Sequence, residues 1–128
     1  MLSTEAKPTV CVIHADSHER ERLRSLIARH GCLVRDFPSA AAFLSERACN
    51  GRCCLVVDLN GPAACRLLER LRTEASCPSS ILIAQGGDVP AAVRAMRAGA
   101  SALIQKPYAR SALMREIRRL VESREKTT

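Results

Sequence analysis

The sequence predicts an α/β fold, a doubly wound parallel β-sheet with helices on both faces. Short apolar runs of strand length alternate with longer stretches in which apolar residues recur at helical spacing, five of each. Strict alternation is typical of parallel sheets, because right-handed crossovers place each connecting helix on one face of the sheet. A chain of 128 residues is long enough to form one such domain around a single core.

The first half of the chain contains two predicted strands and two predicted helices. The first helix places Leu23, Leu26 and Ile27 on one face, and Gly31 is expected to end it, because glycine is common just after a helix C-terminus. The expected segments are the strand Thr9–His14, the helix His18–His30, the strand Cys32–Phe37 and the Ala-rich helix Ala40–Ala48, which Asn50-Gly51 ends.

The second half continues the alternation with three strands and three helices. Its first strand is an apolar run ending at Asp58, and the lack of polar alternation predicts that this strand is covered on both faces. In the next-to-last helix, spacing suggests that Val93 and Met96 point inward. The remaining segments are the helix Pro62–Glu74, the strand Ser79–Ala84, the helix Val89–Ala98, the strand Ser101–Gln105 and the helix Ala109–Arg124.

Composition narrows the class of function. The net charge of +7 is spread over several helices without aromatic interleaving or a recognisable binding motif, which disfavours direct nucleic-acid binding by this domain. No signal peptide or membrane-spanning run is evident, so we expect a cytoplasmic protein without membrane contact. The seven cysteines are then expected to be reduced thiols in structural positions: Cys11, Cys32, Cys49, Cys53, Cys54, Cys65 and Cys77.

Asp58 is the first candidate for function. It ends a buried strand, and ligands of open α/β sheets bind beyond the carboxyl ends of the strands. The same edge is expected to carry the segment from His14 to Asp16, Ala84 and Lys106. An acid and a lysine that meet at this edge indicate a site.

Several stretches resemble the receiver domains of two-component response regulators, especially the LuxR-type, FixJ-like branch. They are GDVPAAVRAMRAGASALIQKPY at 87–108, SAAAFL at 39–44 and VVDL at 56–59, and the similarity covers roughly residues 9–122. The resemblance implies a flavodoxin-like fold with strand order 2-1-3-4-5 and five helices. The receiver domain is then expected at 9–124, with an N-terminal tail at 1–8 and a tail or linker start at 125–128.

The resemblance also implies roles for residues along the carboxyl edge. By position Asp58 is the acceptor of a phosphoryl group from a histidine kinase, Lys106 contacts that group, and the bond before Pro107 is cis. Two acids of the family are replaced, because His14 and Ala15 stand where they belong and Asp16 comes one place later. The switch hydroxyl and switch aromatic of the family are replaced by Ala84 and Leu103.

These replacements predict a degenerate phosphorylation site. Mg²⁺ prefers carboxylate oxygens, so we expect Asp58 and a displaced Asp16 to bind it weakly at most. A strand register shifted by one residue would bring Asp16 into the ligand position and stays open as an alternative. Phosphoryl transfer depends on such charge neutralisation, so transfer to Asp58 should be slow or absent.

The sequence therefore favours an atypical receiver domain, a signalling module that acts by protein–protein interaction and is not an enzyme. Its expected partner is a histidine kinase or another signalling protein, and a homodimer through residues 89–121 is a further expectation. One alternative is a conventional receiver, phosphorylated on Asp58, that regulates transcription through an attached or partner DNA-binding domain. A second alternative is a thiol redox sensor that uses Cys53 and Cys54.

Overall fold

The computed structural model describes residues 7–46, 53–74 and 77–126, the last three as backbone only. The predicted end of the second helix at Ala48, its break at Asn50-Gly51, Cys49 and most of the expected N-terminal tail lie outside the described residues. Within the described residues, five parallel strands form one sheet in the order β2-β1-β3-β4-β5, which confirms the predicted fold class and strand order.

The elements alternate along the chain as predicted, with boundaries that differ by one or two residues. The strands are β1 (Thr9–His14), β2 (Leu33–Phe37), β3 (Cys54–Asp58), β4 (Ser79–Gln85) and β5 (Ala102–Lys106). The helices are α1 (Ser17–Arg29), α2 (Ala40–Glu46), α3 (Gly61–Arg72), α4 (Val89–Ala98) and α5 (Arg110–Lys126). Lys106 is the last residue of β5, one residue beyond the predicted end of this strand.

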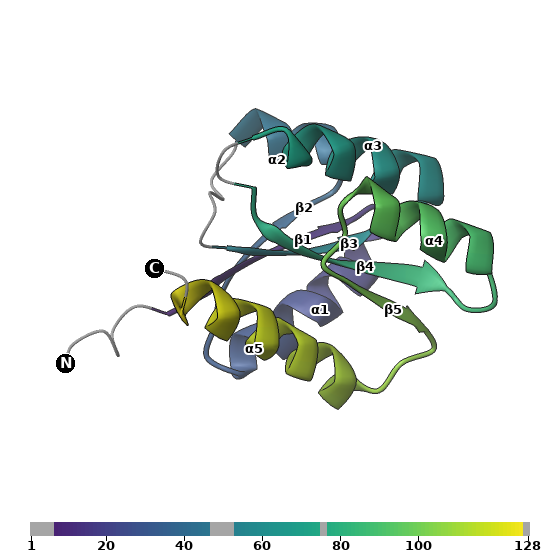
Figure 1. Cartoon of the computed structure of the whole chain (residues 1–128). Helices are drawn as coiled ribbons and strands as arrows, with labels where there is room; N and C mark the ends of the chain where they lie inside the picture. Colours follow the sequence, from purple (N-terminus) through teal and green to yellow (C-terminus); the bar gives the residue numbers. More distant parts are fainter. Residues whose placement is uncertain (1–6, 47–52, 75–76, 127–128) are drawn as a thin grey trace.

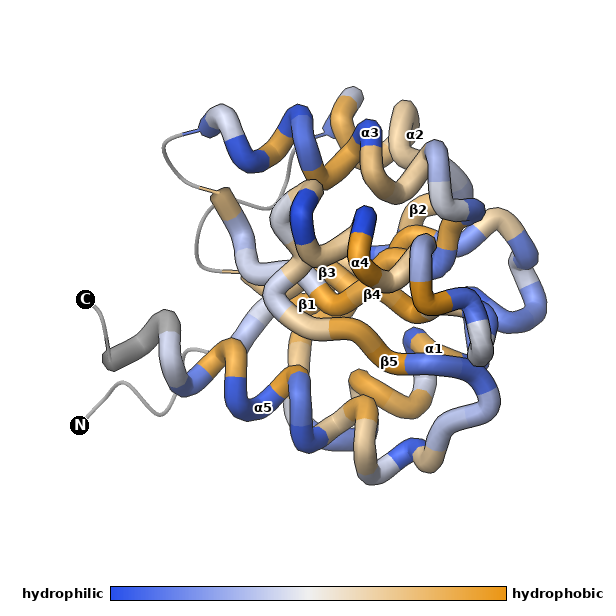
Figure 2. The backbone as a smooth tube through the Cα atoms, turned by 45° about the vertical axis from the view of Figure 1, so that its right-hand side comes forward, coloured by the Kyte–Doolittle hydropathy of each residue, from blue (hydrophilic) through white to orange (hydrophobic). Residues whose placement is uncertain are grey.

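The helices form a layer on each face of the sheet. Helices α2, α3 and α4 lie on one face, and α1 and α5 lie on the other (Figure 1). Apolar residues concentrate along the strands between these layers (Figure 2). Two clusters of buried side chains follow, one on each face, because successive residues of a strand point to opposite sides.

Helix α4 departs from the prediction. Val93 and Met96 were expected inward, but their exposed fractions are 44% and 47%, and Val89 is 64% exposed. The buried residues of this helix are Ala95 and Ala98. The prediction was wrong because helical spacing defines a stripe without saying which stripe meets the sheet, and small alanines allow the closer approach to it.

The cysteines differ in part from the expectation of reduced thiols. Cys11, Cys32 and Cys65 carry free thiols, and burial raises the pKa of Cys11 to about 11, which keeps it protonated and unreactive. Cys53 is disulfide-bonded, which differs from the expected reduced thiol. Cys53 precedes the start of β3, at the opposite end of this strand from Asp58.

In the described part of the chain, every helix is too short or too polar to cross a membrane.

Candidate functional site

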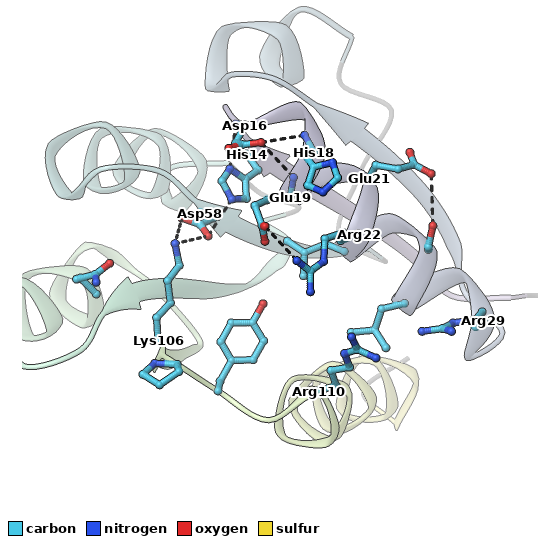
Figure 3. Close-up of a pocket in the computed structure, with 16 residues that line it drawn as sticks. His14, Asp16, His18, Glu19, Glu21, Arg22, Arg29, Asp58, Lys106 and Arg110 are labelled. Atoms are coloured by element: carbon cyan, nitrogen blue, oxygen red, sulfur yellow. Dashed lines mark hydrogen bonds and ion pairs between the residues drawn. The ribbon is translucent and has the colours of Figure 1, made fainter.

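Asp58 lies at the carboxyl edge of the sheet with two donors on its carboxylate. Lys106 Nζ is 2.9 Å from Asp58 Oδ2 and 3.2 Å from Oδ1, and His14 Nε2 is 3.2 Å from Oδ2. The side chain of Asp58 is only 13% exposed, so these contacts replace most of the hydration that its charge requires. Figure 3 shows His14 and Lys106 converging on Asp58 from β1 and β5.

The hydrogen bonds of His14 assign its tautomer. The backbone N–H of Asp16 donates to His14 Nδ1 over 3.2 Å, so Nδ1 is the acceptor nitrogen and the ring proton is on Nε2. Nε2–H then donates to Asp58 Oδ2. A metal ion bound at Nε2 would force the proton onto Nδ1, where it would face the Asp16 N–H. His14 is therefore arranged as a donor to Asp58 and not as a metal ligand.

The strand register decides which residue of the β1 end faces Asp58. His14 pairs with Asp58 across β1 and β3, so the unshifted register is the observed one. Asp16 lies outside the strand as the N-cap of α1, where its Oδ1 accepts from the backbone N–H groups of His18 and Glu19 at 2.9 and 3.2 Å. The Glu19 bond, followed by the His18 bond, lowers the pKa of Asp16 below its usual 3.8.

Arg20 fixes the end of β1, a role that the sequence reasoning missed. Its Nη1 donates to the backbone carbonyl of His14 over 2.9 Å, and its Nε donates to Asp36 Oδ2 over 2.9 Å. The guanidinium thereby joins β1 to β2 next to the site. An arginine in the first turn of a helix carries no signal for this contact, because Asp36 is distant in sequence.

The β4 and β5 ends complete the edge. Ala84 lies on β4 with a methyl group in place of any hydroxyl, and Leu103 lies on β5, partly buried against the core on the α4 side. The Lys106–Pro107 peptide bond is cis. At Gly86 an added Cβ would lie 2.6 Å from the Lys106 carbonyl oxygen, so the loop after β4 packs directly on the residue that holds Asp58.

Two clefts open from this point. The larger, about 970 Å³, runs between α1 and the segment after β5, and the smaller, about 490 Å³, runs between α3 and α4. His14, Asp58 and Lys106 line both clefts. Tyr108 lines only the larger one, and its pKa is raised first by burial and then by the charge of Asp58. The sequence reasoning gave Tyr108 no role, although it follows the Lys-Pro pair.

The donor set fits Mg²⁺ poorly. Mg²⁺ takes oxygen ligands in octahedral geometry, but the β1 end offers an imidazole N–H and the methyl group of Ala15. Within the described residues, no group of three or more His, Cys, Asp or Glu side chains could hold a metal ion. Asp58 and Asp16 are the predicted weak ligands. The Asp58 carboxylate contacts Lys106 and His14, and the Asp16 carboxylate caps the N-terminus of α1.

Residues 10–118 match the family model of the response regulator receiver domain. The chain belongs to this family. Receiver domains are signalling modules of two-component systems and partners of histidine kinases, so the predicted family and general function are confirmed.

Sequence relatives include whole transcriptional regulators. This receiver domain is 35% identical over 111 residues to the transcriptional regulatory protein FixJ of Azorhizobium caulinodans, covering 85% of the chain and 53% of FixJ. It is 32% identical to the C4-dicarboxylate transport transcriptional regulatory protein DctD of Pseudomonas aeruginosa, covering 94% of the chain and 26% of DctD. The receiver domain thus spans about half of FixJ and a quarter of DctD.

Solved structures agree with this assignment. The crystal structure of FixJ-N superposes with a TM-score of 0.80 at 33% identity, covering 91% of the receiver domain and 95% of that chain. Full-length FixJ from B. japonicum gives a TM-score of 0.80 at 30% identity, with 94% and 60% covered. A receiver domain protein from Clostridium thermocellum gives 0.85 at 20% identity, which supports the fold alone.

Proposed function

We propose that this receiver domain signals by protein–protein contact without depending on phosphoryl transfer to Asp58. The observation that carries the proposal is the occupation of the Asp58 carboxylate by two donors of the chain itself, Lys106 and His14. Lys106 would have to turn from the carboxylate to an added phosphoryl group, and Mg²⁺ would have to displace His14. No carboxylate of the β1 end is placed to bind the metal, because Asp16 caps α1.

The relay that would report phosphorylation is also missing. A phosphoryl group shifts a conformational equilibrium only if it interacts differently with the two states. Ala84 offers no hydroxyl for a phosphoryl oxygen, and Leu103 offers no aromatic ring that could change place with it. A modified Asp58 would therefore have little differential contact energy with two states of the domain.

The first test compares the wild-type domain with a His14→Asp/Ala15→Asp variant, which places two acids at the end of β1. Amide NMR at Asp58, Leu59 and Lys106 follows Mg²⁺ binding, and intact mass follows adduct formation after incubation with acetyl phosphate. We expect weak shifts and no adduct for the wild type. We expect the double variant to bind Mg²⁺ at least about tenfold more tightly than the wild type. Substitutions near a bound metal commonly change its affinity by about 10- to 100-fold.

A wild-type domain that binds Mg²⁺ saturably and forms an adduct as fully as the double variant would contradict the proposal. That result would favour the conventional receiver, which regulates transcription through an attached or partner DNA-binding domain. An Asp58→Ala change in each background is the control, because any adduct on another residue would survive it.

Two narrower proposals concern partners and redox chemistry. Self-association through residues 89–121 stays a prediction, and the exposed Arg94, Arg97, Arg110 and Arg115 on that face oppose it by like charge. A thiol sensor based on Cys53 and Cys54 would form oxidation-dependent oligomers that are lost when both are replaced. The disulfide at Cys53 shows that this residue can be oxidised, as a thiol sensor requires. It lies at the opposite end of β3 from Asp58.

A further inference from the structure

The larger cleft extends beyond Asp58, between α1 and the segment that leads from β5 into α5. Leu23 and Leu26 of α1 line it, and they are only 6% and 7% exposed, so they present an apolar surface at its base. Tyr108 lines it from the other side and is partly buried against the same cluster. An aromatic ring beside an apolar base favours a ligand with an apolar body.

The acidic side chains of this cleft already have partners within the chain. Two of the four are the aspartates at the Asp58 end, which make the contacts described above. The other two are Glu19, which lies 3.4 Å from Arg22 Nη1, and Glu21, which lies 3.6 Å from Arg24 Nη1. The acids of the cleft are therefore not available to neutralise further cations.

Two further cations of the cleft are unpaired. Arg29 of α1 and Arg110 of α5 line it and are exposed, and neither has an ion-pair partner among the described residues. Both lie away from Asp58 (Figure 3). Arg29 suits the last turn of α1, but Arg110 is the first residue of α5, where the helix macrodipole disfavours a cation. Helix stability therefore does not explain Arg110.

We infer that the larger cleft binds a small organic anion with an aromatic or other apolar body. Arg110 would bind the carboxylate of such a ligand through paired N–H donors, Arg29 would add positive charge, and the body would lie on Leu26 and Tyr108. The volume of about 970 Å³ is within the usual range of small-molecule sites. This inference goes beyond the proposed function, because it assigns a ligand to residues that do not contact Asp58.

The probe is 3-phenylpropanoate, which joins one aromatic ring to one carboxylate. Three matched compounds are 3-phenylpropanamide without charge, 3-phenylpropylamine with a positive charge, and inorganic phosphate without an apolar body. Amide NMR of the full chain follows each titration at low salt. We expect saturable shifts with 3-phenylpropanoate alone, centred on Leu26, Tyr108 and Arg110. The dissociation constant should be about 1 mM, as for other ligands of this size, and should rise with salt.

Matched variants locate the binding within the cleft. Arg110→Gln should weaken the binding of 3-phenylpropanoate about fivefold or more, because the carboxylate loses a charged donor. Arg115→Gln removes the same charge from the same helix outside both clefts and should bind like the wild type. Tyr108→Ala should weaken binding, whereas Tyr108→Phe keeps the ring and should retain it. Thermal unfolding checks that each variant stays folded.

Any one of four results would overturn the inference. They are the absence of saturable shifts with 3-phenylpropanoate, equal binding of 3-phenylpropanamide or inorganic phosphate, equal loss in Arg110→Gln and Arg115→Gln, and shifts centred on the smaller cleft. None of these results bears on phosphoryl transfer to Asp58. The proposed function is tested separately by the experiment with Mg²⁺ and acetyl phosphate, so the two can fail independently.

Discussion

Asp58 illustrates what a single position can and cannot reveal. Asp58 ends one apolar strand run and Lys106 follows another, and these two places at the carboxyl edge suffice to predict that the two side chains meet. The donor from His14 was not predicted, because it depends on the rotamer and tautomer of the ring. Both are set by the backbone N–H of Asp16, which no pattern of residue types encodes.

Asp16 leads to a prediction about pH. Its pKa is lowered in the folded chain, so it stabilises the fold fully above its usual pKa of 3.8, and this contribution is lost as the pH falls through the lowered value. Asp16→Asn keeps an N-cap acceptor without a titrating group. We expect the two proteins to have similar stability at neutral pH and the wild type to lose more below 3.8.

The measurement is the free energy of unfolding in urea, taken from neutral pH down to a pH of about 3. Other carboxylates titrate in both proteins, so the difference between the two curves isolates Asp16. Parallel curves over this range would show that the cap bonds do not favour the charged form.

At the scale of elements, the close approach of the loop after β4 to the end of β5 leads to a prediction about Gly86. Because an added Cβ at Gly86 would lie 2.6 Å from the Lys106 carbonyl oxygen, Gly86→Ala must move the loop after β4 or the end of β5. We expect it to lower the free energy of unfolding by about 1–3 kcal/mol, the usual effect of overpacking. It should also shift the amide signals of Lys106 and Asp58.

Gly61→Ala is the matched control. Gly61 begins α3, its φ is not positive and an added Cβ would meet nothing within 4 Å. This substitution should change stability by less than about 1 kcal/mol and can be slightly stabilising. Equal losses in chemical denaturation of the two variants would mean that the close approach at Gly86 relaxes without strain.

Helix α4 shows where spacing stops being informative. The sequence pattern locates the helix, its Asp88 cap and its end at Gly99, and all three are observed. It cannot choose between a stripe of valine and methionine and a stripe of alanine for the buried side. That choice depends on how closely the helix approaches the sheet, which is a property of the assembled layers rather than of the segment.

At the scale of the whole molecule, the sheet separates two buried clusters that share the same strands. Leu71 and Ile117 are each 1% exposed, one in each cluster. We expect Leu71→Ala and Ile117→Ala each to lower the free energy of unfolding by about 2–5 kcal/mol. Because both clusters share the same strands, each variant should still unfold in one transition.

Tyr108 provides the test of that cooperativity. It is the only tyrosine in a chain without tryptophan, and it packs against the cluster on the α1 and α5 face. Its fluorescence and the far-UV circular dichroism of all helices should give the same urea midpoint in each variant. A fluorescence midpoint displaced in Ile117→Ala alone would indicate that the two faces unfold separately.

The division of the core also dictates an order of events at the ribosome. All fully buried members of the cluster on the α3 and α4 face lie at or before Ala100, but the other cluster contains Leu113, Met114, Ile117 and Leu120 of α5. During synthesis, one face of the sheet can therefore close while the other still exposes the apolar side chains of β1, β3 and β4. A holdase chaperone could bind this exposed apolar face of the sheet until α5 leaves the ribosome and covers it.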